Sequence, residues 1–296
     1  MADTNLAPFS YKTYHLELPL TRLHILEAGS GEPLIVVPAT ISELENWVDL
    51  IQFMAQWFHV YFFELPGHGG SSAFSQRFST SLVAETVAHL ADRLQLERFN
   101  LMGFSFGGIL AMRTFQLLHD RIDRVILNAP CVTRRAILLS KPQKFAMWNV
   151  NLLFRRQMVR RYLHRSFHHP RRRARLVSLF QTVGKVEHRE HLENKLAKTN
   201  LSTIEVLTEE IAEIMNVEFP HPAQKFDTPC YLTMSVNDPL LDFQTTLDEL
   251  ECHFTNVHVT RLDFPFHQPP KPFTFDELTR DFKESAKKFL GRGLGN

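Results

Sequence analysis

The fold of this chain is decided by the stretch Asn100-Leu101-Met102-Gly103-Phe104-Ser105-Phe106-Gly107-Gly108. It predicts the end of a buried strand, a sharp turn at Ser105 and the start of a helix, with the serine hydroxyl pointing away from the sheet. The residues two before and two after the serine crowd such a turn, which explains why both Gly103 and Gly107 are glycine. Because the first N–H groups of the helix point back at the turn, the Phe106 N–H is placed to stabilise an oxyanion.

This G-x-S-x-G pattern, with an apolar strand before it and an apolar helix after it, resembles the nucleophile elbow of the α/β-hydrolase superfamily. The stretch Glu64-Leu65-Pro66-Gly67-His68-Gly69-Gly70-Ser71-Ser72 resembles the D-x-P-G-x-G-x-S turn of the same superfamily, with Glu64 where Asp is common. We interpret His68 as a structural turn histidine. Two matches at the right separation disfavour the alternative that the first motif is only a glycine-rich turn with a hydrogen-bonded serine.

The apolar runs around these motifs predict an α/β fold, with a mostly parallel central sheet flanked by helices. Short strands are expected from about residue 11 to residue 37, and later strands at 59–63, 124–128, 228–235 and 257–262. Amphipathic helices are expected at 80–94 and 276–290. Gly29 and Gly31 do not form a dinucleotide-binding loop, because the third glycine is missing and no helix is predicted there.

Between residues 132 and 222 helical runs replace the alternation of strands and helices. The superfamily inserts a cap over the active site at this place. The resemblance therefore implies three segments: residues 1–131 and 223–296 form the α/β-hydrolase core, and residues 132–222 form a helical cap.

A serine hydroxyl needs a base, and the base needs an orienting acid. In this superfamily the chain order is Ser, then Asp or Glu, then His, each on a loop after a strand. Asp238 follows the strand at 228–235 and His267 follows the last strand, so the resemblance implies a catalytic set of Ser105, Asp238 and His267. Other acids remain as rivals for the orienting role: Asp227, Asp242 and Asp263.

The loop after the strand at 34–37 reads Pro38-Ala39-Thr40, where the superfamily usually has His-Gly before the donor residue. By position, the resemblance implies that the Thr40 N–H is the second oxyanion donor beside that of Phe106. Pro38-Ala39 is less permissive than His-Gly. Trp47 matches an aromatic residue that is often found just downstream.

These residues favour an enzyme that cleaves a carboxylic ester or a related acyl bond through an acyl-Ser105 intermediate. A serine at this position argues against the branches that use a carboxylate nucleophile, but the same set of residues also serves acyl transfer and carbon–carbon bond hydrolysis. The alternative from another class is a ligand-binding or signalling protein with little turnover, which the altered Pro38-Ala39 loop motivates. Phe104 and Phe106 flank the serine, so an apolar acyl substrate is expected unless both rings are simply core.

Composition places the chain among ordinary globular proteins, with 296 residues and 44% hydrophobic residues. No apolar run is long enough to span a bilayer, and no secretory signal is apparent at the start. The three cysteines, Cys131, Cys230 and Cys252, are far apart and odd in number, which indicates free thiols in a reducing compartment. We therefore expect a cytoplasmic protein, either free or at a membrane surface.

No metal or cofactor is expected. His164 and His168 have helical i, i+4 spacing, but no carboxylate completes a ligand set, and His188 and His191 are equally unsupported. The phosphate-binding pattern G-x-x-x-x-G-K-[ST] is absent from the sequence.

Charge is distributed unevenly along the chain. Residues 124–186 contain 15 Lys and Arg and no Asp or Glu, while the rest of the chain carries a net charge of −14. On a helix, the apolar side chains Met158, Val159, Tyr162 and Leu163 share one arc, and most of the basic ones lie on the other: Arg156, Arg160, Arg161 and Arg165. The basic cap is expected to attract a membrane surface, an acidic protein or an anionic substrate; nucleic acid is disfavoured, because no binding module surrounds the cluster. The alternative is a solvated face paired with acids of the same chain. The sequence leaves the oligomeric state open.

Overall fold

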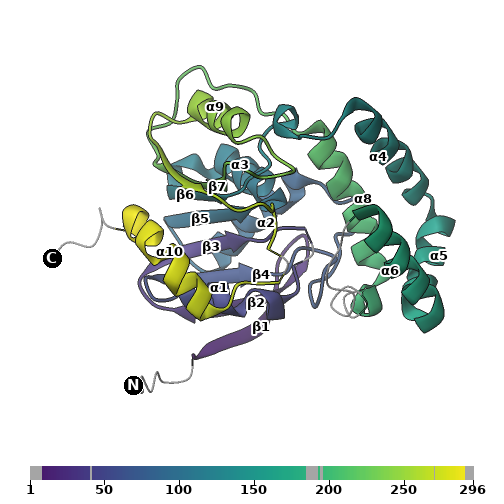
Figure 1. The fold of residues 1–296 in the computed structure, drawn as a ribbon. Coiled ribbons are helices and arrows are strands. Elements are labelled where there is room, and N and C mark those ends of the chain that lie inside the picture. Colours follow the sequence, from purple (N-terminus) through teal and green to yellow (C-terminus); the bar gives the residue numbers. More distant parts are fainter. Residues whose placement is uncertain (1–8, 41, 185–192, 194–195, 270, 291–296) are drawn as a thin grey trace, which may run out of the picture.

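The computed structural model describes residues 9–40, 42–184, 193, 196–269 and 271–290. In this part of the chain an eight-stranded sheet has the order β1-β2-β4-β3-β5-β6-β7-β8 (Figure 1). Its strands are β1 (Tyr11–Glu17), β2 (Arg22–Gly29), β3 (Glu32–Val37), β4 (Phe58–Phe63), β5 (Phe99–Phe104), β6 (Ile122–Asn128), β7 (Cys230–Ser235) and β8 (Val257–Leu262). β1 pairs antiparallel with β2, and β2 with β4, whereas every pair from β3 to β8 is parallel. The predicted mostly parallel α/β sheet is thereby confirmed.

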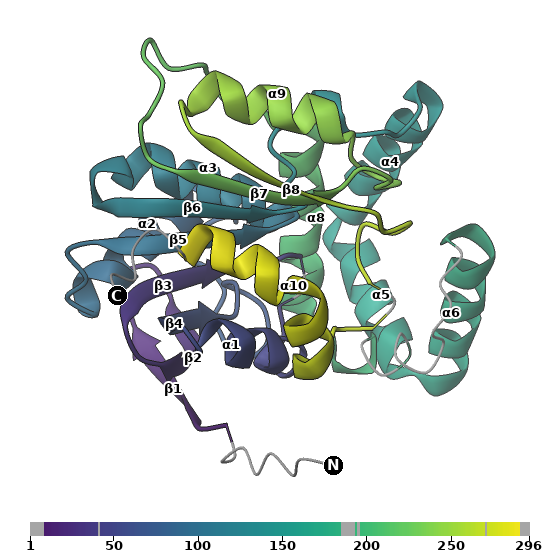
Figure 2. The same cartoon turned by 60° about the vertical axis from the view of Figure 1, so that its left-hand side comes forward.

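Helices cover both faces of the sheet (Figure 2). One face is packed by α2 (Thr80–Arg93), α3 (Phe106–Leu118) and α9 (Phe243–His253), and the other by α1 (Val48–Met54) and α10 (Phe275–Leu290). Side chains alternate across a strand, so Ile35 and Val37 of β3 join the first core while Leu34 and Val36 join the second. A strand buried on both faces needs a continuous apolar run, and this is why residues 34–37 are all apolar.

Between β6 and β7 the chain forms the α-helices α4 (Lys141–Phe154), α5 (Gln157–His168), α6 (Pro170–Gly184) and α8 (Leu201–Asn216), which lie beside the sheet (Figure 1). They occupy the region in which the sequence predicts a helical insertion. α8 attaches this layer to the turn after β4, because the hydroxyls of Ser202 and Thr203 each donate to the Gly67 carbonyl oxygen at 3.0 Å. None of the described helices is long and apolar enough to cross a membrane.

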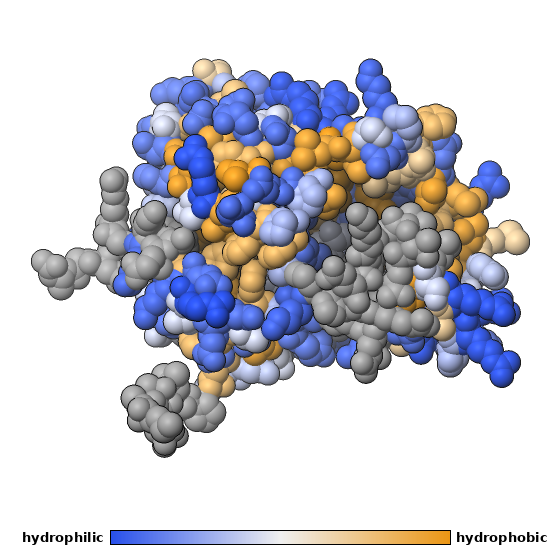
Figure 3. Space-filling view, in the orientation of Figure 1, coloured by the Kyte–Doolittle hydropathy of each residue, from blue (hydrophilic) through white to orange (hydrophobic). Residues whose placement is uncertain are grey.

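The apolar arc of α5 is not buried as a whole. Met158 and Tyr162 are 84% and 62% exposed, so they lie on the solvent side. The Arg160 guanidinium is turned inward and lies 3.3 Å from the Glu205 carboxylate of α8. This ion pair with α8 favours the observed rotation of α5 about its axis. Helical periodicity alone does not predict which side of α5 faces the protein. Apolar surface also gathers over α4 (Figure 3).

Candidate active site

Ser105 lies at the turn between β5 and α3, where the sequence predicts it. Its φ is +50°, a strained value for a residue other than glycine. A Cβ on Gly103 would lie 2.3 Å from the Gly107 carbonyl oxygen, and one on Gly107 would lie 2.6 Å from that of Pro38. Both contacts are with backbone, so the turn closes only with glycine at these two positions.

The structure brings Ser105, His267 and Asp238 together from three separate loops. Ser105 Oγ lies 2.7 Å from His267 Nε2, and His267 Nδ1 lies 2.6 Å from Asp238 Oδ2. The Asp238 side chain is buried, the His267 side chain is 11% exposed, and Ser105 is half-buried. A hydroxyl, an imidazole and a carboxylate in this order make the nucleophile, base and orienting acid of acyl-transfer chemistry.

The rival acids have other partners. The Asp242 side chain accepts the N–H of Thr245 at 2.8 Å and so caps the start of α9. Asp263 accepts from the Asn237 side chain, and Asp227 accepts from the Thr255 hydroxyl. Of the four acids that the sequence leaves open, Asp238 is the one that lies against His267.

Asp238 is held in its ionised form. Burial alone would raise the pKa of its carboxyl, but the hydrogen bond and positive charge of His267 and two backbone N–H groups lower it, and the net effect is a lowered pKa. Those N–H groups belong to Leu240 and Leu241 and lie 2.8 and 3.1 Å from Oδ1. The second oxygen is therefore left for the imidazole alone.

The acid loop is itself supported by the segment that leads into α4. Ile137 forms an antiparallel bridge with Leu241, and the Leu138 N–H donates to the Leu240 carbonyl oxygen at 2.9 Å. The Asp242 N–H donates to the Ala136 carbonyl oxygen at 2.7 Å.

Ser235, at the end of β7, joins the acid loop to the histidine loop, and sequence reasoning missed it. Its hydroxyl donates to the Phe264 carbonyl oxygen at 2.6 Å and accepts the N–H groups of Phe264 and Asn237 at 2.9 and 3.1 Å. Ser235 is 5% exposed. A serine as the last residue of a strand between two candidate loops is the signal that would have indicated this role.

The two expected oxyanion donors belong to two segments that meet at the turn. Phe106 is the first residue of α3, and the first N–H groups of a helix have no partner within it. Thr40 is half-buried in the loop after β3. The carbonyl oxygen of Pro38, in the same loop, lies close to Gly107, so this loop contacts the turn that carries Ser105. The Trp47 ring packs edge-on against the Phe104 ring, with 5.1 Å between centroids, beside the serine.

His68 is buried in its turn, as a structural role requires, and its Nε2 lies 3.7 Å from Glu210 Oε1 of α8. Burial raises the pKa of the Glu210 carboxyl to about 8. Glu64, in the same turn, accepts the N–H groups of Leu44 and Gly70 and contacts the ring of His24 in β2, so it joins this turn to two other segments.

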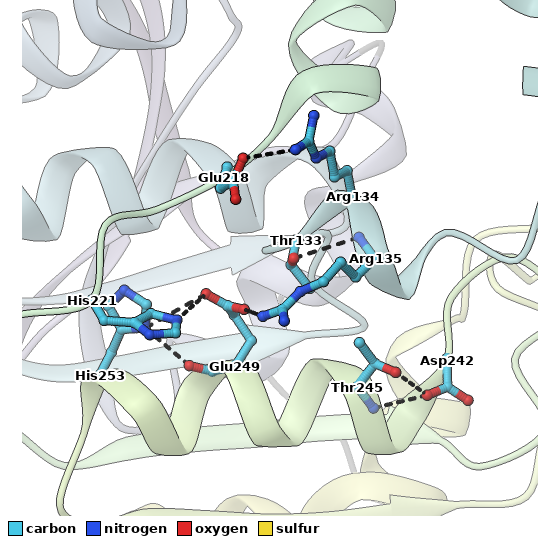
Figure 4. Close-up of polar contacts among 9 residues, drawn as sticks. All are labelled: Thr133, Arg134, Arg135, Glu218, His221, Asp242, Thr245, Glu249 and His253. Carbon is cyan, nitrogen blue, oxygen red and sulfur yellow. Dashed lines mark hydrogen bonds and ion pairs between the residues drawn. The ribbon is translucent and has the colours of Figure 1, made fainter.

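Both connections to the helical insertion are tied to α9 (Figure 4). Arg135, on the outgoing side, and His221, on the returning side, contact the buried carboxylate of Glu249 at 2.6 and 3.3 Å. Arg134 and Glu218 join the two connections by an ion pair of 3.1 Å. The insertion is therefore fixed to the core at its base.

No three His, Cys, Asp or Glu side chains gather into a metal-binding group among the described residues. His164 and His168 stack on each other, with 4.4 Å between ring centroids. His188 and His191 lie outside the described residues. A hollow of about 560 Å³ lies at the amino ends of β6, β7 and β8, at the opposite edge of the sheet from Ser105.

Comparison with known proteins identifies the family. The family model for the α/β hydrolase fold matches residues 32–213. The chain therefore belongs to the α/β-hydrolase fold family.

Individual relatives are distant. The chain is 27% identical over 106 residues to an (E)-2-((N-methylformamido)methylene)succinate hydrolase of Acinetobacter baylyi, a match that covers 36% of this chain and 40% of that protein. It is 28% identical over 119 residues to a pimeloyl-[acyl-carrier protein] methyl ester esterase of Nitrosomonas europaea, covering 40% of this chain and 45% of that protein. The matches thus span less than half the length of these relatives. A solved structure of a putative acyltransferase from Salmonella enterica has the same fold, with a TM-score of 0.71 and 18% identity over 98% of this chain and 99% of that one.

Proposed function

We propose that the protein is a serine hydrolase that cleaves a carboxylic ester or a related acyl bond. The observation that carries the proposal is the continuous chain of contacts from Ser105 Oγ to His267 Nε2, at 2.7 Å, and from His267 Nδ1 to Asp238 Oδ2, at 2.6 Å. The comparisons support the proposal, because one of the two relatives described above is a hydrolase and the other is an esterase.

In the first half of the proposed reaction, Ser105 Oγ attacks the acyl carbon while His267 Nε2 takes the hydroxyl proton. The N–H groups of Phe106 and Thr40 stabilise the oxyanion that forms. When the tetrahedral intermediate collapses, the bond to the leaving alcohol breaks and His267 gives its proton to that alcohol, leaving an acyl-Ser105.

In the second half, water attacks the acyl carbon and gives a proton to His267. Collapse of the new intermediate releases the carboxylic acid and returns the proton to Ser105 Oγ. Asp238 accepts the Nδ1–H throughout, which selects the tautomer with a free Nε2 and stabilises the imidazolium.

The substrate expected for this site is an uncharged, apolar acyl group. Phe104 and Trp47 line up beside the nucleophile, and both side chains are half-buried. A panel of chromogenic esters of increasing acyl length would measure the preference, and an added alcohol that captures the acyl group would separate acyl transfer from hydrolysis.

The test of the proposal is labelling of the folded protein by a fluorophosphonate, followed by location of the adduct by mass spectrometry. We expect a single adduct on Ser105. Ser105→Ala should remove it, and Ser81→Ala, which changes an exposed serine of α2, should not. Folded protein that remains unlabelled would instead favour a ligand-binding protein on the same fold.

A further inference from the structure

The outer face of α4 is apolar. Phe145, Trp148 and Leu152 follow each other at i, i+3 and i+7 and are 71%, 36% and 44% exposed. Val150 and Leu153 add two further side chains that are each 49% exposed. Figure 3 shows the corresponding hydrophobic surface over α4.

The inner face of the same helix carries a polar residue, since Asn151 is only 2% exposed. A helix bordered by water usually keeps large apolar side chains on its inner face, whereas α4 exposes five of them. Exposed apolar area costs about 25 cal/mol per Å² relative to burial, and a contiguous patch of it marks an interaction site.

The next helix, α5, also has an exposed face with apolar side chains, and this face adds positive charge. Met158, Arg161, Tyr162 and Arg165 are all exposed and stand at i, i+3, i+4 and i+7, on one side of the helix. Aromatic and apolar side chains therefore lie among guanidinium groups, a combination typical of helices that lie in the headgroup region of a bilayer.

Among the described residues, the arginines of the insertion divide into two groups, with and without an acidic partner. Arg155 and Arg160 pair with Glu209 and Glu205 of α8. In the part of the chain that the structure describes, no acidic side chain pairs with the outward-facing arginines of the insertion: Arg156, Arg161, Arg165, Arg171, Arg172 and Arg175. Pairing with acids of the same chain is therefore seen for Arg155 and Arg160.

We propose that the outer faces of α4 and α5 form a docking surface for an anionic lipid bilayer. Phe145, Trp148, Leu152 and Met158 enter the boundary between headgroups and acyl chains, and Arg161 binds lipid phosphates with the neighbouring arginines. This inference goes beyond the proposed function and does not rest on it, because binding is measured without turnover.

A bilayer fits the surface better than a protein does. A fluid bilayer can accept exposed apolar and cationic side chains without a complementary shape. A second copy of the chain would bring the same cationic face into an isologous contact, and the like charges would repel. The absence of any Asp or Glu from residues 124–186 fits a negatively charged surface.

The experiment is co-sedimentation of the full chain with phosphatidylcholine vesicles that contain or lack phosphatidylserine, at low and high salt. We expect binding to the anionic vesicles only, weakened by salt through screening. Phe145→Ser and Trp148→Ser should each weaken it about tenfold. Arg161→Gln and Arg165→Gln should each weaken it about fivefold.

The matched control is Leu117→Ser, which removes a side chain of α3 that is 52% exposed but lies outside the docking surface. It should leave binding unchanged. Circular dichroism melting checks that the variants, all at exposed positions, keep the native fold.

Failure of the native protein to bind anionic vesicles would overturn the proposal. So would binding that survives the combined Phe145→Ser and Trp148→Ser change. A dimer in analytical ultracentrifugation that this double variant dissociates would assign the surface to self-association and would equally refute it.

Discussion

Glu210 should make the stability of the protein depend on pH. Its side chain lies on the buried side of α8 and is fully buried, and neither carboxylate oxygen has a hydrogen-bond partner among the described residues. Burial raises the pKa of this carboxyl from 4.5 to about 8. An acid with a raised pKa binds its proton more tightly in the folded protein. Its contribution to stability is therefore complete below the unfolded pKa and is lost as the pH rises through the folded value.

One pKa unit corresponds to about 1.36 kcal/mol, so ionisation of Glu210 should cost about 4 kcal/mol of folding free energy between about pH 5 and pH 9. That is a large share of the roughly 5–15 kcal/mol that stabilises a typical domain. Glu210→Gln removes the titrating group at nearly constant volume. Between about pH 5 and pH 9, the free energy of unfolding of this variant should therefore fall by about 4 kcal/mol less than that of the native protein.

The assay is urea unfolding of both proteins across that range, with Glu85→Gln, an exposed acid of α2, as the matched control. The control should follow the native curve. Parallel curves for the native protein and Glu210→Gln would refute the reasoning. The reasoning would also be refuted if Glu210→Gln were less stable than the native protein at low pH only. That result would mean that Glu210 is ionised at low pH and paired with a protonated His68, whose Nε2 lies 3.7 Å from Glu210 Oε1.

Three further predictions concern the candidate active site. Ser105→Ala and His267→Ala should each abolish ester turnover, and the double variant should be little less active than either single variant. Asp238→Asn should lower the rate less. A near-native rate in His267→Ala would show that the base is misassigned. Thr40→Ala should do little, whereas Thr40→Pro should be severe because it removes the proposed N–H donor; unchanged activity in folded Thr40→Pro would move that donor elsewhere. Ser235→Ala should lower kcat about tenfold or more with little change in KM, because it frees two loops that hold the acid and the base; an effect on melting temperature alone would make Ser235 merely structural.

The sequence predicts the fold well because the strongest signals are local. The glycines around Ser105 are required by backbone contacts within the turn, and the apolar run at residues 34–37 is required by burial on both faces of the sheet. The order of loops along the chain also pointed to Asp238 and His267 as neighbours of Ser105.

What the sequence did not predict depends on contacts between distant segments. The rotation of α5 depends on the contact of Arg160 with Glu205, which are far apart in the sequence. Ser235 matters only because Phe264 comes within hydrogen-bond distance of it. The burial of Glu210 likewise depends on how α8 lies on the turn after β4.

The pairing of Ile137 with Leu241 limits how this protein can be recombined with its relatives. Insertions between two strands of a sheet are natural units for chimeras, and the end of β6 is the obvious place to cut. A cut there would remove residues 136–138 together with the helices, and with them the hydrogen bonds that support the loop of Leu240 and Leu241. A chimera joined after Leu138 would exchange α4 to α8 and keep Asp238 in its place.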